Sequence, residues 1–165
     1  MKTLFLGRHA KSSWNNALLA DQDRPLNERG LRDAPRMGKR LADRGVRPNL
    51  IISSPALRAY DTAVKIAGEI DYPVSDIQVT KEIYLEGKTG ILNAISLLDS
   101  NIDSVMLIGH NPGITIAVNY LAQADLDNVP TCGIAEIQFD FELWSEIDSS
   151  TGKMVLFDYP KRIKD

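Results

Sequence analysis

Three short apolar runs restrict the folds that are open to this chain. The runs "TLFLG", "LIIS" and "SVMLIG" occupy residues 3–7, 50–53 and 104–109 and contain no charged side chain. A continuous apolar run of this length is typical of a strand that is buried on both faces, as in a parallel sheet. Each run is followed by a segment with apolar residues at helical spacing. Alternating strands and helices of this kind predict an α/β protein.

The helical segments carry recognisable end signals. Residues from about 27 to 45 predict a helix that ends at a glycine, and Pro35 either kinks this helix or delays its start. The dipeptide "SP" at 54–55 places a capping serine before a proline at the first helical position, and "NP" at 111–112 repeats this pattern. The remaining predicted elements are a helix over 89–99 and two late strands over 133–144 and 153–159.

Composition narrows the function classes. The 165 residues are 44% apolar, which fits one domain with a full core over residues 1–165. A net charge of −3 argues against a general nucleic-acid binder. No segment is apolar for long enough to span a bilayer, and Gly7, Arg8 and His9 interrupt the apolar start before it reaches signal-peptide length. The single Cys132 excludes an internal disulfide and fits a reducing compartment. Together, these observations predict a cytoplasmic protein without a nucleic-acid or membrane partner.

The two histidines of the chain occupy the same kind of position. His9 follows the first apolar run and His110 follows the third. In an open α/β sheet, ligands bind beyond the carboxyl ends of the strands, where Arg8 and Arg58 also fall. Arg58 is expected in the first turn of its helix, where free N–H groups favour an anion. Guanidinium groups match phosphate oxygens and a neutral imidazole can attack phosphorus, so this rim suits a phosphoryl group.

Other kinds of site fit the sequence less well. Histidine is the commonest metal ligand, but these histidines have arginine neighbours, and no HExxH motif or Cys/His cluster is present. The segment "AKSS" lacks the glycines of a phosphate-binding P-loop, where Phe5 and Ala10 stand instead. "GHNPG" has Asn111 in place of the serine of a nucleophile elbow. No metal or cofactor is expected, and a structural role for either histidine is the alternative.

Four motifs in sequence order carry a resemblance to a known family. "RHAKSSWN" matches Arg-His-Gly-Glu-Ser-x-Trp-Asn except at Ala10 and Lys11, and "RPLNERG", "SSPALRAYDTA" and "LIGHNPG" provide the other three. In these motifs, which span about residues 4–113, the chain resembles the histidine phosphatase superfamily of phosphoglycerate mutases and acid phosphatases. It is most similar to the SixA-type phosphohistidine phosphatase branch. The resemblance implies a three-layer α/β/α sandwich with a mostly parallel central sheet, like that of phosphoglycerate mutase.

The resemblance also implies roles for the histidines and arginines. His9 would be the nucleophile of a metal-independent phosphatase and would form a covalent phosphohistidine that water then hydrolyses. Arg8, Arg58 and His110 would hold the phosphoryl oxygens and stabilise charge in the transition state. The same three groups would favour the neutral, nucleophilic form of His9.

Three further residues are candidates with open alternatives. Asn15 is a candidate phosphate contact, or else a helix or turn cap. Many relatives use a glutamate between the two histidine motifs as general acid; Glu82 in "KEIYLEG" is the first candidate here and Glu86 the second. A solvated surface carboxylate is the alternative for either glutamate.

The expected substrate follows from the short chain between the helix that begins near Arg58 and the helix predicted over 89–99. Little of this chain remains for a lid, so we expect a shallow, open site. Such a site suits a phosphorylated protein partner, for example a histidine-phosphorelay protein, and also small phosphate esters. A small-molecule phosphomonoesterase or mutase, and a non-catalytic phosphate-binding module, are the alternative functions.

Overall fold

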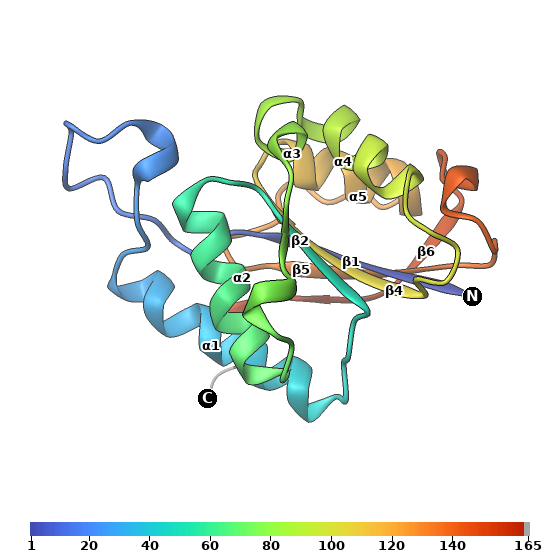
Figure 1. Cartoon of the computed structure of the whole chain (residues 1–165), viewed down its shortest axis with the longest axis horizontal. Helices are drawn as coiled ribbons and strands as arrows, with labels where there is room; N and C mark the ends of the chain where they lie inside the picture. The colour runs from blue at the N-terminus through green and yellow to red at the C-terminus, as the bar shows by residue number, and fades with distance from the viewer. Residues whose placement is uncertain (164–165) are drawn as a thin grey trace.

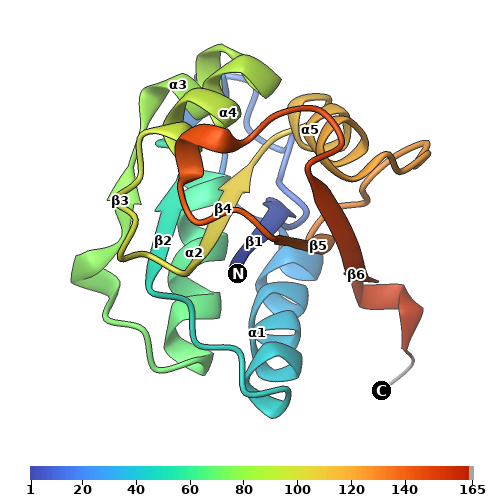
Figure 2. The same cartoon turned by 90° about the vertical axis from the view of Figure 1, so that its right-hand side faces the viewer.

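The computed structural model describes residues 1–163 (Figure 1) and is built around one six-stranded sheet with the strand order β3-β2-β4-β1-β5-β6, which Figure 2 shows. Strands β3, β2, β4 and β1 are paired in parallel, whereas β5 pairs antiparallel with both β1 and β6. The sheet is therefore mixed and its parallel part is the larger one, as expected. The strands are β1 (Lys2–Arg8), β2 (Leu50–Ser53), β3 (Gln78–Val79), β4 (Ser104–Gly109), β5 (Ile134–Phe139) and β6 (Gly152–Asp158).

Helices cover both faces of the sheet, which confirms the α/β/α layering (Figures 1 and 2). One face carries α1 (Glu28–Asp43) and α2 (Leu57–Glu69). The other carries α3 (Lys81–Leu85), α4 (Gly87–Ser96) and α5 (Gly113–Ala122). Four short 3-10 helices complete the described elements: η1 (Asp21–Asp23), η2 (Val74–Asp76), η3 (Trp144–Glu146) and η4 (Pro160–Arg162). No helix within residues 1–163 is long and apolar enough to cross a membrane.

The apolar strands are shared between two cores. Leu4 and Leu6 of β1 pack in the cluster with α4 and α5, while Phe5 between them packs in the cluster with α1 and α2. The residues of β4 alternate in the same way. Successive side chains of a strand point to opposite faces, so a run that is apolar at every position needs cover on both sides. This need explains why the three runs form the centre of the sheet.

The parallel strands bring their carboxyl ends to one edge. Arg8 at the end of β1 lies opposite Gly109 at the end of β4. Beyond the strands, the N–H of His9 donates to the carbonyl of Gly109 at 3.0 Å, and the N–H of Ser54 donates to the carbonyl of Ile108 at 3.1 Å. Backbone pairing therefore fixes where the residues after β1, β2 and β4 leave the sheet.

Helix α1 agrees with its predicted ends. The side chain of Asn27 caps it by accepting a hydrogen bond from the N–H of Gly30 at 2.9 Å, and Gly45 follows with a φ of 73°. Pro35 lies inside the helix and does not delay its start. The predicted helix over 89–99 is also present, as α4, although it begins and ends earlier.

Three sequence predictions of local structure are wrong. Ser54 does not cap α2, which begins at Leu57 after Ala56, because the Ser54 side chain binds the N–H of Ala56 and the ring of His110 instead. The proline of "NP" is the N-cap of α5 rather than its first residue. The strand predicted over 133–144 ends at Phe139, and Trp144 lies in η3, where its Nε1 donates to a backbone carbonyl at 2.7 Å. The short elements β3 and α3 had no sequence prediction.

Candidate active site

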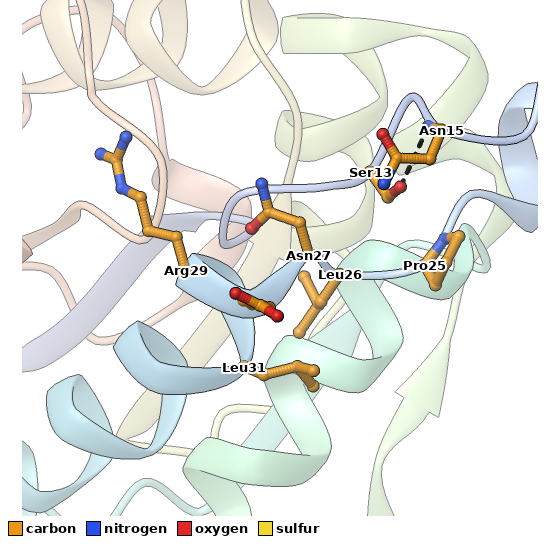
Figure 3. Close-up of a pocket in the computed structure, with 8 residues that line it drawn as sticks. Ser13, Asn15, Pro25, Leu26, Asn27, Arg29 and Leu31 are labelled. Carbon is orange, nitrogen blue, oxygen red and sulfur yellow. Dashed lines mark hydrogen bonds between the residues drawn. The ribbon is translucent and has the colours of Figure 1, made fainter.

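A cavity of about 210 Å³ lies at the carboxyl edge of the parallel strands. Most of its lining comes from the end of β1 and the loop after it. The first turn of α2 and the segments after β4 and before β5 provide the rest. A larger cavity of about 570 Å³ lies beside the start of α1 and includes neither histidine (Figure 3). The smaller cavity is lined by Arg8, His9, Lys11, Ser12, Trp14, Arg24, Arg58, His110, Asn111 and Thr131.

His9 is held in a neutral form with one ring nitrogen free of the fold. Its Nδ1 donates to the carbonyl oxygen of Ala10 at 2.7 Å, which leaves the lone pair on Nε2. The side chain is buried, with 7% of its surface exposed. The pKa of His9 is lowered to about 3. Burial is the largest cause, and the charges of His110, Arg58 and Arg8 contribute to the same lowering. The sequence predicted the effect of these charges but not the larger effect of burial.

His110 lies next to His9, with 5.1 Å between the ring centroids. A hydrogen bond of 2.8 Å joins its Nε2 to the Ser54 hydroxyl. The ring centroids of His110 and Tyr84 are 5.3 Å apart. Burial, followed by the charge of Arg58, lowers the pKa of His110 to about 4. Both histidines are therefore neutral at pH 7.

Both arginines line the cavity that holds His9. Arg8 donates from one terminal nitrogen to the carbonyl of Val129 at 3.1 Å. Arg58 is the second residue of α2 and so lies in the first turn of its helix, as the sequence predicted. The Nε of Arg8, the Nε of Arg58 and the Nδ1 of His110 are buried without a hydrogen-bond partner among residues 1–163. All three residues line the cavity, where the terminal N–H groups of the two arginines are suited to a polar ligand.

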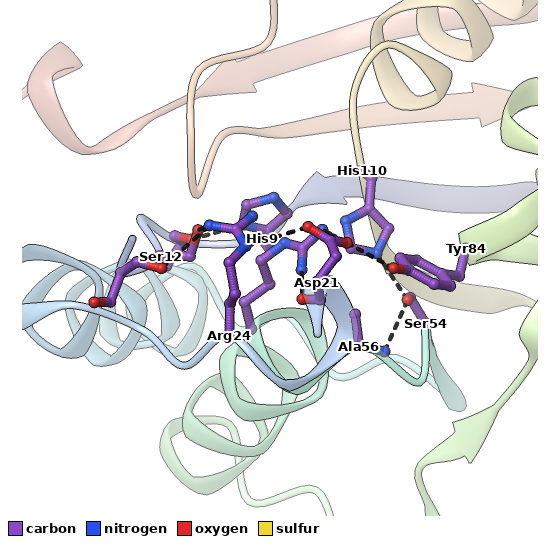
Figure 4. Close-up of polar contacts among 11 residues, drawn as sticks. His9, Ser12, Asp21, Arg24, Ser54, Ala56, Tyr84 and His110 are labelled. Atoms are coloured by element: carbon purple, nitrogen blue, oxygen red, sulfur yellow. Dashed lines mark hydrogen bonds and ion pairs between the residues drawn. The ribbon is translucent and has the colours of Figure 1, made fainter. Parts of the chain in front are cut away.

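The structure adds Asp21, Arg24 and Tyr84 to the predicted residues (Figure 4). Asp21 and Trp14 belong to residues 13–23, which we call the strap. Asp21 contacts Arg58 twice, through its carbonyl at 2.8 Å and its carboxylate at 3.0 Å, and its carboxylate also accepts from the Nε of Arg24 at 3.2 Å. The Tyr84 hydroxyl donates to the same carboxylate at 2.6 Å. No sequence periodicity marks these residues. The only sequence signal is their position: Arg24 begins the "RPLN" motif, Asp21 lies just before it, and Tyr84 lies in the same short segment as Glu82.

The strap is held at its base and at its aromatic side chain. The N–H of Ser13 donates to the carbonyl of Pro25 at 2.8 Å, which closes the loop. The guanidinium of Arg24 lies 3.4 Å from the ring centroid of Trp14, whose own surface is 72% exposed at the rim of the cavity. The strap, which lies between β1 and α1, therefore reaches the rim of the cavity through Trp14. The shallow, open site expected from the short chain between α2 and α4 stays a prediction.

Three predicted candidates lie outside the histidine cavity. Asn15 lines the larger cavity, and its N–H donates to the Ser13 hydroxyl at 3.1 Å (Figure 3). Glu82 on α3 and Glu86 just after it are both exposed. None of these three residues is part of the lining of the cavity that holds His9. The carboxylate bonded to Arg58 is that of Asp21, which the sequence analysis did not single out.

The site has no obvious place for a metal ion. Across residues 1–163, no group of three or more His, Cys, Asp or Glu side chains is arranged to hold one. The groups around His9 are instead guanidinium donors and a second imidazole. Such a set can bind a phosphoryl group, neutralise its charge and present a nucleophilic nitrogen to phosphorus.

Comparison with known proteins identifies the family. Residues 4–96 match the histidine phosphatase superfamily (branch 1), and the chain belongs to this superfamily. An uncharacterised chloroplastic protein of Arabidopsis thaliana is 31% identical over 159 residues, which cover 92% of this chain and 72% of that protein. This membership supports phosphatase activity.

Two solved structures share the fold. The putative phosphohistidine phosphatase SixA from Agrobacterium tumefaciens superposes with a TM-score of 0.83 at 29% identity, covering 96% of this chain and 98% of that one. A protein histidine phosphatase SixA complexed with tungstate gives a TM-score of 0.82 at 24% identity over 98% of this chain and 99% of that one. The phosphoglycerate mutase-like sandwich predicted from the motifs is thereby confirmed.

Proposed function

We propose that this protein is a metal-independent phosphatase that forms a covalent phosphohistidine on His9 and takes the phosphoryl group from phosphohistidine in a partner protein. The observation that carries the proposal is the state of His9: its Nδ1 is held by a carbonyl, its pKa is lowered to about 3, and its Nε2 is left as the nucleophile. Arg8, Arg58 and His110 supply the donors around it.

The reaction has two steps in this proposal. Nε2 of His9 attacks phosphorus, the bond from phosphorus to the substrate nitrogen breaks, and the departing imidazole keeps a proton taken from solvent. Water then attacks the phosphorus on His9, which returns neutral His9 and inorganic phosphate. Arg8 and Arg58 neutralise the equatorial oxygens in both steps, and His110 contributes a hydrogen bond from a ring held by Ser54.

The choice of phosphohistidine as substrate rests on the leaving group. An alkyl ester needs a well-placed acid to protonate the departing alkoxide, whereas a protonated imidazole departs readily. The carboxylate nearest the catalytic arginine is Asp21, and its hydrogen bond from Tyr84, with those from Arg58 and Arg24, lowers its pKa to about 2. Asp21 is therefore ionised and unable to donate a proton at pH 7. The similarity to a putative phosphohistidine phosphatase from Agrobacterium tumefaciens also supports this substrate.

A substrate panel tests the proposal. We expect kcat/KM to be higher for a phosphohistidine protein than for alkyl phosphate esters, and activity to survive chelators. Efficient turnover of one small ester without action on phosphohistidine would assign the chain to the phosphomonoesterases or mutases. Loss of activity in chelator that one divalent metal restores would contradict metal independence. Phosphate binding without turnover of any substrate would indicate a binding module.

A further inference from the structure

Asp21 places a negative charge against the arginine that should bind the negatively charged substrate. We infer that the Asp21 carboxylate is an internal anion that shares Arg58 with the phosphoryl group and thereby lowers the affinity of the site for phosphate, the product of the reaction. Asp21 acts through Arg58 and is a positioning residue in this inference, which rests on the proposed function of the His9 site.

The contacts of Arg58 support a shared guanidinium. An arginine has five N–H donors, and Asp21 uses one from each terminal nitrogen of Arg58. Each terminal nitrogen keeps one further N–H that makes no hydrogen bond among residues 1–163, and these donors are left for a second anion. The guanidinium is thus oriented by Asp21 and only partly occupied by it.

The charge on Asp21 persists under working conditions. Its carboxylate also takes hydrogen bonds from Arg24 at 3.2 Å and from Tyr84 at 2.6 Å, and the Tyr84 bond is the largest cause of its low pKa of about 2. Three groups therefore keep this carboxylate ionised: Arg24 directly after the strap, Arg58 in α2 and Tyr84 in α3 (Figure 4). The side chain is 48% exposed, so solvent weakens its field without removing it.

The two effects of Asp21 on phosphate oppose each other. Orientation of Arg58 favours binding, whereas repulsion between the carboxylate and a phosphate dianion disfavours it. An asparagine keeps an oxygen that can accept from Arg58 and removes only the charge. If repulsion is the larger effect, the Asp21→Asn protein must bind phosphate more tightly. If Asp21 serves structure alone, the same change must leave phosphate binding unchanged or weaken it.

The test measures binding of inorganic phosphate to the full chain by calorimetry, without turnover. We expect Asp21→Asn and Asp21→Ser to lower the Kd for phosphate about 3- to 10-fold, and the gain to shrink at high salt. Asp23→Asn is the matched control, because Asp23 belongs to the same short helix η1, is exposed, and has a side chain with no described hydrogen bond or ion pair within residues 1–163. We expect this control to change the Kd by less than about 2-fold.

Each outcome has a distinct meaning. Tighter binding by the Asp21 variants but not by the control supports the inference, even if a substrate other than phosphohistidine is found. Unchanged or weaker phosphate binding by both variants, with melting temperatures near that of the wild type, overturns it. Absence of phosphate binding in wild type and variants alike overturns the inference together with the proposed phosphoryl site.

Discussion

The strand ends and the strap meet at one cavity but are held there by different means. His9 and His110 directly follow neighbouring strands, and backbone hydrogen bonds of the sheet fix their positions. Asp21 and Trp14 arrive on an irregular loop and are held by side-chain contacts to Arg58 and Arg24. In the proposed mechanism the strand ends carry the reacting histidines, while the strap adjusts the charge and the rim around them. Substitutions at the strand ends should therefore lower turnover strongly, whereas substitutions in the strap should change the affinity for phosphate by a smaller factor.

The largest effect is expected at the nucleophile. His9→Ala should reduce turnover by at least about 10³-fold, because the nitrogen that bonds to phosphorus is removed. The fold should persist, since the sheet pairing near His9 uses its backbone. Radiolabelled phosphate, quenched without acid, should be trapped on His9 of the wild type and absent from the variant. Turnover by His9→Ala at the rate of the wild type would contradict the covalent mechanism.

The groups that stabilise charge should have the next largest effect. Arg58→Ala or His110→Ala should lower kcat by about 10²-fold or more, because each removes a donor to the phosphoryl oxygens. The phosphoenzyme should still form slowly in single-turnover experiments, unlike in the His9 variant. An unchanged kcat in either variant would show that its residue has a different role.

Titration of the histidines tests the strand ends without mutation. The chain has two histidines, so NMR should show two imidazole spin systems. Both should remain neutral well below the ordinary pKa of 6.5, with values near 3 for His9 and 4 for His110. Because the unfolded chain takes up these protons at a higher pH, stability should fall as the pH drops from about 6.5 towards 4. A pKa near 6.5 for His9 would contradict its buried, neutral state.

The smallest effect is expected at the exposed glutamate of α3. Glu82→Ala should change kcat/KM by less than about 2-fold for both phosphohistidine and alkyl esters, as surface substitutions away from a site usually do little. This expectation replaces the proton-donor role that the sequence suggested. A selective loss of ester hydrolysis would restore that role and would require Glu82 to approach the cavity in the substrate complex.

The sequence predicted those parts of the molecule that depend on long apolar patterns. His9 and His110 could be placed because each follows a doubly buried strand, and parallel strands of one sheet share an edge. Arg58 could be placed because its helix begins after the next such strand. These residues obtain their positions from backbone regularity, which apolar patterns reveal.

The remaining parts depend on contacts that leave no local pattern. Asp21 meets Arg58 and Tyr84 across three separate segments, and no spacing in the sequence encodes such a meeting. Ser54 met the rule for a helix cap, but its hydroxyl is used by His110. Strand β3 has two residues and helix α3 has five, too few for a periodic signal. Side-chain bonds between distant segments overrode local preference in each case.

The pairing of β1 with β4 has a consequence for how the protein acquires its site during folding. Arg8 and Gly109 are register partners although they are about 100 positions apart in the chain. Contacts of such long sequence separation cost loop-closure entropy and form only when much of the chain has collapsed. His9, the proposed nucleophile, and the neighbouring imidazole of His110 therefore come together in the same event that joins the centre of the sheet. During refolding, phosphatase activity should return at the same rate as the central sheet forms.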